Sequence, residues 1–83
     1  MSIQDFIIGD RVIVRDSYPN FYVLPSPPIG TVVEISSFSM GIQFDKLFCG
    51  HSCYENAIEG YGWYVPVQYV DIYRDTTIVF EIL

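Results

Sequence analysis

The sequence has few basic residues and no long apolar run. Four Lys or Arg residues face ten Asp or Glu residues in 83 positions, for a formal net charge of −6. Nucleic-acid binders usually present a basic surface to the phosphates, so nucleic acid is not expected as a partner, whereas a basic protein surface is permitted. No apolar run approaches the roughly 18 residues of a membrane-spanning helix, so no membrane association is expected.

Other absences limit the compartment and the chemistry. Two cysteines make no disulfide framework, and residues 1–5 lack the basic start of a signal peptide, so we expect a cytoplasmic chain with free thiols. The sequence has no Gly-rich phosphate loop ahead of a helix, and His51 is its single histidine. Because a nucleophile needs a base that a third group orients, we expect no catalytic residue, no cofactor and no enzymatic activity.

The sequence is rich in apolar and aromatic residues, which make up 51% and 17% of the chain. That supply gives a short chain the dense core it needs. In the segment 11–16 apolar and polar residues alternate, with Val12 and Val14 on one face, as in a half-buried strand. We predict a single all-β domain over residues 1–83, a small barrel of about five strands. The strands are expected near residues 11–16, 31–35, 40–45, 60–66 and 70–73.

Three further segments have patterns of their own. Ser52 and Glu55 have the spacing of a helix capping box and Gly60 is a typical helix stop, so one short helical turn is expected across 52–58. The proline-rich loop 17–29 carries apolar residues that either fold back over the core or form part of a binding lip. Residues 77–83 predict a C-terminal strand, which would complete the sheet or pair with a second copy in a homo-oligomer.

The stretch 60–70 concentrates the only Trp and three of the seven Tyr. Pro66 cannot donate to a sheet, so the strand must end there and the chain must turn before it re-enters the sheet. Tyr61 and Trp63 share one face of this strand and Tyr64 lies on the other. If Tyr64 points inward, Tyr61 and Trp63 present their rings outward.

Exposed Tyr and Trp side chains are typical of protein-binding hot spots. The same rings would also stack on a nucleobase, with His51 or an Arg holding a phosphate. A third interpretation is that the rings fill the interior of the small barrel. The predicted binding residues are His51, Tyr54, Tyr61, Trp63, Tyr64, Pro66 and Tyr69.

The segment Cys49–Cys53 brings both thiols close to the imidazole of His51. On an extended segment these three side chains share a face, and thiolate and imidazole are good zinc ligands. Structural zinc sites use four ligands, however, and the chain has no second group of this kind. We therefore expect no metal site, and expect small buried thiols beside a hydrogen-bonded histidine.

Several short motifs occur in an order that resembles SH3-like small barrels. They are Gly9-Asp10-Arg11-Val12, Gly30-Thr31-Val32-Val33, Ile42-Gln43-Phe44-Asp45 and the segment from Trp63 to Val70. The run from Pro66 to Val70 is similar to a turn of true SH3 domains, in which the residues equivalent to Pro66 and Tyr69 help to line a groove for proline-rich peptides. Trp63 departs from that pattern, because it precedes the proline by three residues.

A second resemblance is to small phage-encoded proteins. It depends on Gly50-His51, Cys53 and a Gly-x-Gly-Trp motif that ends at Trp63. It implies a non-enzymatic, phage-encoded protein that acts in the host cytoplasm against a bacterial defence system. Such a protein would bind a host protein through the aromatic face. Two alternatives stay open, namely an oligomeric binder or sponge for a nucleotide signal, and a structural or assembly factor that uses residues 77–83.

Overall fold

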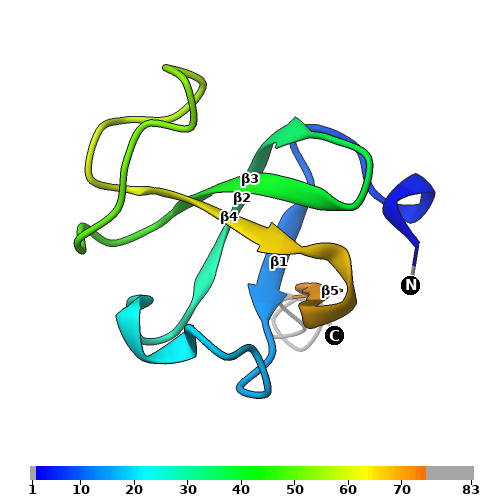
Figure 1. Ribbon diagram of the computed structural model, residues 1–83, viewed down its shortest axis with the longest axis horizontal. Coiled ribbons are helices and arrows are strands. Elements are labelled where there is room, and N and C mark those ends of the chain that lie inside the picture. Colours follow the sequence, from blue (N-terminus) through cyan, green and yellow to red (C-terminus); the bar gives the residue numbers. More distant parts are fainter. Residues whose placement is uncertain (1, 75–83) are drawn as a thin grey trace, which may run out of the picture.

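The computed structural model describes residues 2–74, in which five strands form one antiparallel sheet that curls into a small barrel (Figure 1). The strand order across the sheet is β4-β3-β2-β1-β5. The strands are β1 (Arg11–Val14), β2 (Ile29–Ile35), β3 (Ser39–Phe44), β4 (Gly62–Pro66) and β5 (Val70–Ile72). Single 3-10 turns occur at η1 (Ile3–Asp5), η2 (Phe21–Val23) and η3 (Val67–Tyr69).

The interior of the barrel is filled by the apolar side chains that alternate along the strands. Val12 and Val14 of β1 are buried, as the pattern predicted, and Ile42 and Phe44 of β3 face them from across the barrel. β4 ends at Pro66 and leads through η3 directly into β5, so the turn predicted from the proline is confirmed. The fully buried core residues include Val12, Val32, Met40, Ile42, Phe44, Val65 and Val70.

The predicted all-β small barrel of about five strands is confirmed. The helical turn predicted across 52–58 is wrong, because this segment forms an irregular turn with left-handed backbone at Cys53, Tyr54 and Glu55. The predicted C-terminal strand, residues 77–83, lies outside the described residues. None of the helical segments within residues 2–74 has the length and apolar character needed to cross a bilayer.

The long loop between β1 and β2 folds back over the core, which was one of the two interpretations of its apolar residues. Tyr18 is buried, and Phe21 and Leu24 pack against the core cluster. Tyr22 is the exception, with 81% of its side chain exposed. The segment before β1 behaves in a similar way, since Phe6 is buried in the core.

A β-bulge at Val33 changes the face to which the end of β2 directs its side chains. Val32 pairs with Ile42 of β3, but Glu34 pairs with Gly41, so β2 has one extra residue at this point. Without the bulge, Glu34 would share the inward face of Val32, because side chains alternate along a strand. The bulge directs Glu34 to the outer face instead, as bulges commonly do beside functional sites.

Candidate functional site

The site is built on the outer face of β2, β3 and β4, where Glu34, Gly41 and Tyr64 lie side by side across three strands. Because Gly41 has no side chain, the Tyr64 ring can lie across β3, and its Cε1 is 3.2 Å from the place where a Cβ of residue 41 would be. The Tyr64 hydroxyl donates to the Glu34 carboxylate at 2.8 Å. Burial is the largest cause of a raised pKa at Tyr64, and this hydrogen bond is the second. The phenol of Tyr64 therefore stays protonated.

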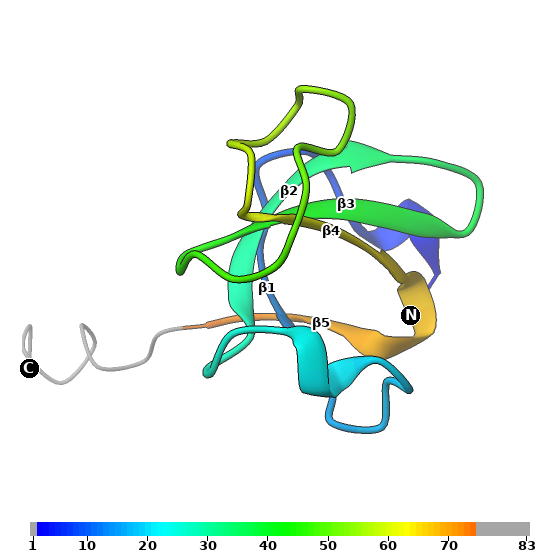
Figure 2. The same ribbon diagram turned by 60° about the vertical axis from the view of Figure 1, so that its left-hand side comes forward.

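The loop between β3 and β4, residues 45–61, rises from this face and covers part of it (Figure 2). The arm that leads to its tip is tied to the edge of β4 by a pair of backbone hydrogen bonds between His51 and Gly62, at 2.7 and 2.8 Å. Cys53 is 1% exposed, and its sulfur lies over β3 and β4 at Gly41 and Gly62. Glycine at 62 is required there, because a Cβ would come within 2.9 Å of the Cys53 sulfur and 2.6 Å of the His51 carbonyl oxygen.

At its tip the loop holds three consecutive residues, none of them glycine, in the left-handed region. The φ angles are 49° at Cys53, 55° at Tyr54 and 70° at Glu55. Such angles cost about 1–2 kcal/mol per residue for L-amino acids, so surrounding contacts must hold them. Ser52 Oγ accepts from the Glu55 amide at 3.1 Å, and Asn56 Nδ2 donates to the Cys53 carbonyl oxygen and to Glu34. The turn is therefore fixed to the sheet at both ends.

A pocket of about 310 Å³ opens between this turn and β4 and is lined by His51, Ser52, Cys53, Tyr54 and Tyr64. The ring centroids of His51 and Tyr64 are 5.3 Å apart, and those of Tyr54 and Tyr64 are 6.1 Å apart. Tyr54 is 85% exposed, so its ring forms an outer wall that makes little contact with the protein itself. The volume is at the lower end of the range for ligand pockets, about 300–1,000 Å³, and suits one side chain or a small ring.

The pocket is one end of a row of aromatic side chains that crosses the molecule. His51 stacks on Trp63 with centroids 5.4 Å apart. The Trp63 indole nitrogen donates to the Tyr18 hydroxyl at 3.1 Å, and the Tyr18 ring lies 5.3 Å from that of Tyr69. These contacts between neighbouring rings restrict the movement of the His51 side chain, which forms one wall of the pocket.

The structure brings four of the predicted binding residues into direct contact, namely His51, Tyr54, Trp63 and Tyr64. The orientation expected for β4 is reversed. Trp63 lies on the side of the buried Val65 and packs against the core, whereas Tyr64 lies on the outer face.

The other predicted residues lie apart from the pocket. Tyr69 is connected to the row of rings only through Tyr18, and it packs against the core cluster. Pro66 pairs with Ser39 at the end of β4, and Tyr61 precedes the strand, where its carbonyl oxygen accepts from the Phe44 amide.

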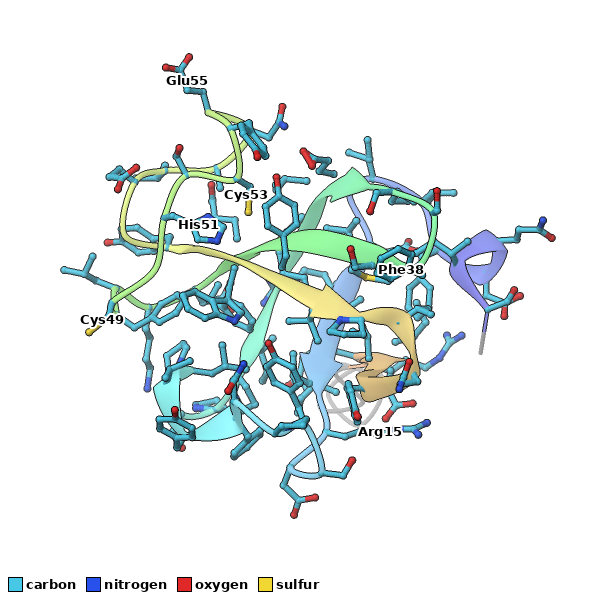
Figure 3. The ribbon with its side chains drawn as sticks, in the orientation of Figure 1. Arg15, Phe38, Cys49, His51, Cys53 and Glu55 are labelled. Carbon is cyan, nitrogen blue, oxygen red and sulfur yellow. The ribbon has the colours of Figure 1, made fainter. Side chains whose placement is uncertain are left out.

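The thiols and the imidazole do not share one face, contrary to the zinc-ligand geometry considered for Cys49–Cys53. Cys49 is exposed and points away from the molecule, whereas the Cys53 sulfur is directed at the sheet (Figure 3). Among residues 2–74 no three His, Cys, Asp or Glu side chains converge as metal ligands would.

The surroundings of Cys53 and His51 also shape their chemistry. Burial, together with the negative charge of Glu34, raises the pKa of the Cys53 thiol to about 11. His51 Nδ1 accepts a hydrogen bond from the Cys53 backbone amide at 3.0 Å, so this ring nitrogen is not available to take a proton from a thiol.

Sequence reasoning missed Glu34 and Asn56, which join the sheet to the turn. Glu34 lies within the expected strand 31–35, and only the bulge at Val33 places it beside Tyr64. The glycines at 41 and 62 were the available signal, because glycine within a strand often marks a close approach of another segment.

Comparison of the chain with models of protein families, with curated proteins and with solved structures gives no match.

Proposed function

We propose that the protein is a non-enzymatic binding protein that holds a partner protein in the pocket formed by His51, Tyr54 and Tyr64. The observation that carries this proposal is the strained left-handed turn, which positions the largely exposed Tyr54 ring as the outer wall of the pocket. Backbone strain persists where the surrounding structure maintains it, and it clusters at ligand-binding sites. Partly exposed Tyr is also among the residues enriched in binding hot spots.

Two contacts support a role without catalysis. The Cys53 thiol is buried and its pKa is raised to about 11, so almost none of it is the reactive thiolate at neutral pH. The Nδ1 of the only histidine accepts a hydrogen bond from the Cys53 backbone amide. A Cys53–His51 nucleophile therefore has neither an available thiolate nor an available base in this arrangement.

The charge around the pocket favours a protein partner over a nucleotide. None of the lining residues is lysine or arginine, and the Glu34 carboxylate lies behind the Tyr64 hydroxyl. A phosphate would meet this negative charge without a cation to balance it, whereas a peptide segment carries no such cost. The net charge of −6 would also accelerate association with a basic protein surface.

The test is capture of a partner from bacterial lysate by the tagged protein and by two single variants. Tyr54→Ala removes the pocket wall, and Tyr22→Ala removes an equally exposed ring from η2. We expect a partner that the parent and Tyr22→Ala retain and Tyr54→Ala loses, and the purified partner must show the same dependence in direct binding. Equal retention by a folded Tyr54→Ala variant, or a nucleotide that raises the melting temperature of the parent, would contradict the proposal.

The biological setting that we propose is the cytoplasm of a bacterial host, where the protein would act for a phage against a defence system. This part depends on the resemblance of Gly50-His51, Cys53 and the Gly-x-Gly-Trp motif to small phage-encoded proteins. Expression in bacteria that carry a defined defence system should restore plating of a restricted phage, and Tyr54→Ala should abolish the effect. If the protein restores phage plating with none of the defence systems in a panel, the anti-defence role is wrong. The binding function is then decided by the capture experiment.

A further inference from the structure

We infer that the pocket takes a cationic side chain of the partner, an arginine or a lysine, held against the Tyr54 and Tyr64 rings, with the Glu34 carboxylate behind the Tyr64 hydroxyl as the nearby negative charge. The inference rests on the proposed function, since it assumes that the occupant belongs to a protein. It adds the chemical class of the residue that is recognised.

The walls of the pocket are rich in aromatic rings. Three of the five lining residues carry a ring, and the His51 and Tyr54 rings each lie against Tyr64, with centroids 5.3 and 6.1 Å from that of Tyr64. The face of an aromatic ring attracts a cation placed within about 6 Å of its centroid, and tyrosine is one of the better rings for this interaction. The pocket volume of about 310 Å³ accommodates one long side chain rather than a folded segment.

The Glu34 carboxylate supplies a negative charge next to the Tyr64 hydroxyl. Within residues 2–74 the ion pairs join Arg11 to Asp45 and Arg15 to Asp71, so Glu34 has no cationic partner there. Its hydrogen bonds come from two neutral donors, the Tyr64 hydroxyl and the Asn56 amide. A hydroxyl that donates to a carboxylate is polarised, which makes the Tyr64 ring more electron-rich and more attractive to a cation.

The backbone of β2 places this carboxylate on the outer face of the sheet. The bulge at Val33 directs Glu34 away from the core and into the row with Gly41 and Tyr64. A partly buried carboxylate without a counter-ion is costly unless it is solvated or paired. A guanidinium or ammonium group from the partner would supply that counter-charge and would also contact the faces of the rings.

The test uses short capped peptides that differ only at a central residue: arginine, lysine, or citrulline, which has the arginine shape without the charge. We expect the arginine and lysine peptides to shift the NMR signals of Tyr54, Tyr64 and His51, and citrulline to bind about tenfold more weakly. Glu34→Gln keeps an acceptor for the Tyr64 hydroxyl, so the fold should persist while the preference for charge shrinks. Tyr22→Ala should leave all affinities unchanged.

The outcomes separate this inference from the proposed function. Equal binding of the citrulline and arginine peptides would overturn the inference, as would an unchanged preference for charge in Glu34→Gln. Absence of any shift at millimolar peptide would overturn it as well. If binding of a captured partner still requires Tyr54 while arginine peptides fail to compete with it, the proposed partner-binding function is retained and only the inference of a cationic occupant is wrong. If no partner depends on Tyr54 but the peptides bind, the pocket recognises cations and the protein-partner function falls.

Discussion

The Cys53 thiol should be nearly inert toward thiol reagents in the folded protein, in contrast to Cys49. Cys53 is 1% exposed, and burial together with the charge of Glu34 raises its pKa from the ordinary value of 9.0 to about 11. Only the thiolate reacts, so a rise of this size lowers the reactive fraction at pH 8 by about 100-fold. The loop also covers the sulfur and hinders the approach of the reagent.

The assay follows the reaction of a chromogenic disulfide reagent with the Cys49→Ser variant, whose remaining thiol is Cys53. At pH 8 the native variant should react at least about 100 times more slowly than the same variant in denaturant. The native rate should also keep rising by roughly tenfold per pH unit to about pH 10, because the thiol has not yet reached its pKa. The parent should show one additional fast thiol, the exposed Cys49.

A native rate equal to that of the denatured variant would refute the reasoning, and so would a plateau of the rate near pH 9 in the native protein. Either result would mean that the loop does not bury the sulfur over β3 and β4. Cys53 would then not hold a fixed position in the lining of the pocket. Glu34→Gln should accelerate the reaction only modestly, since burial is the larger cause of the raised pKa and the charge of Glu34 the smaller.

Three further predictions concern stability, measured by denaturant unfolding. Gly62→Ala should destabilise the protein by about 1–3 kcal/mol, because the new methyl would collide with the Cys53 sulfur at 2.9 Å. Glu55→Gly should stabilise it by up to about 1 kcal/mol, since it relieves the left-handed φ of 70° at a side chain without hydrogen bonds in the described structure. The exposed Arg11–Asp45 pair, whose hydrogen bond lowers the pKa of Asp45, should contribute about 0.2–1 kcal/mol. Because the folded-state pKa of Asp45 is the lower one, this contribution should be complete above about pH 4 and disappear as the pH falls through the folded value, so Asp45→Asn should cost less in acid.

The strands were predictable because their burial follows simple alternation. Val12 and Val14 are buried on one face of β1 as the pattern predicted, and Pro66 ends β4 where its missing donor requires an end. These features depend on residues that are close together in the sequence, so they can be predicted from the sequence alone. The bulge at Val33 is different, because no turn residue or glycine marks it, and a register shift of one residue depends on how β2 and β3 pack together.

The failed helical turn shows how a local pattern can be satisfied by another structure. The first half of the capping box is present, with the Glu55 amide donating to Ser52 Oγ at 3.1 Å. The same bond closes a tight turn as readily as it starts a helix, so the pattern alone does not choose between them. In the turn that forms, Cys53 is 1% exposed and its sulfur lies over Gly41 and Gly62, a contact between the loop and the strands that the local pattern does not contain.

The two strand glycines connect these observations, and they show what a better interpretation of the sequence would have used. Gly41 and Gly62 both face outward, on the side where strands of a small barrel usually carry side chains that meet water. Glycine weakens a strand, so two on the same face need a compensating contact. The Tyr64 ring covers one and the Cys53 sulfur approaches both. Two glycines on the outer face of adjacent strands, offset by two residues in the register, therefore predict a covered outer face, and with it the side of the barrel on which a pocket can form.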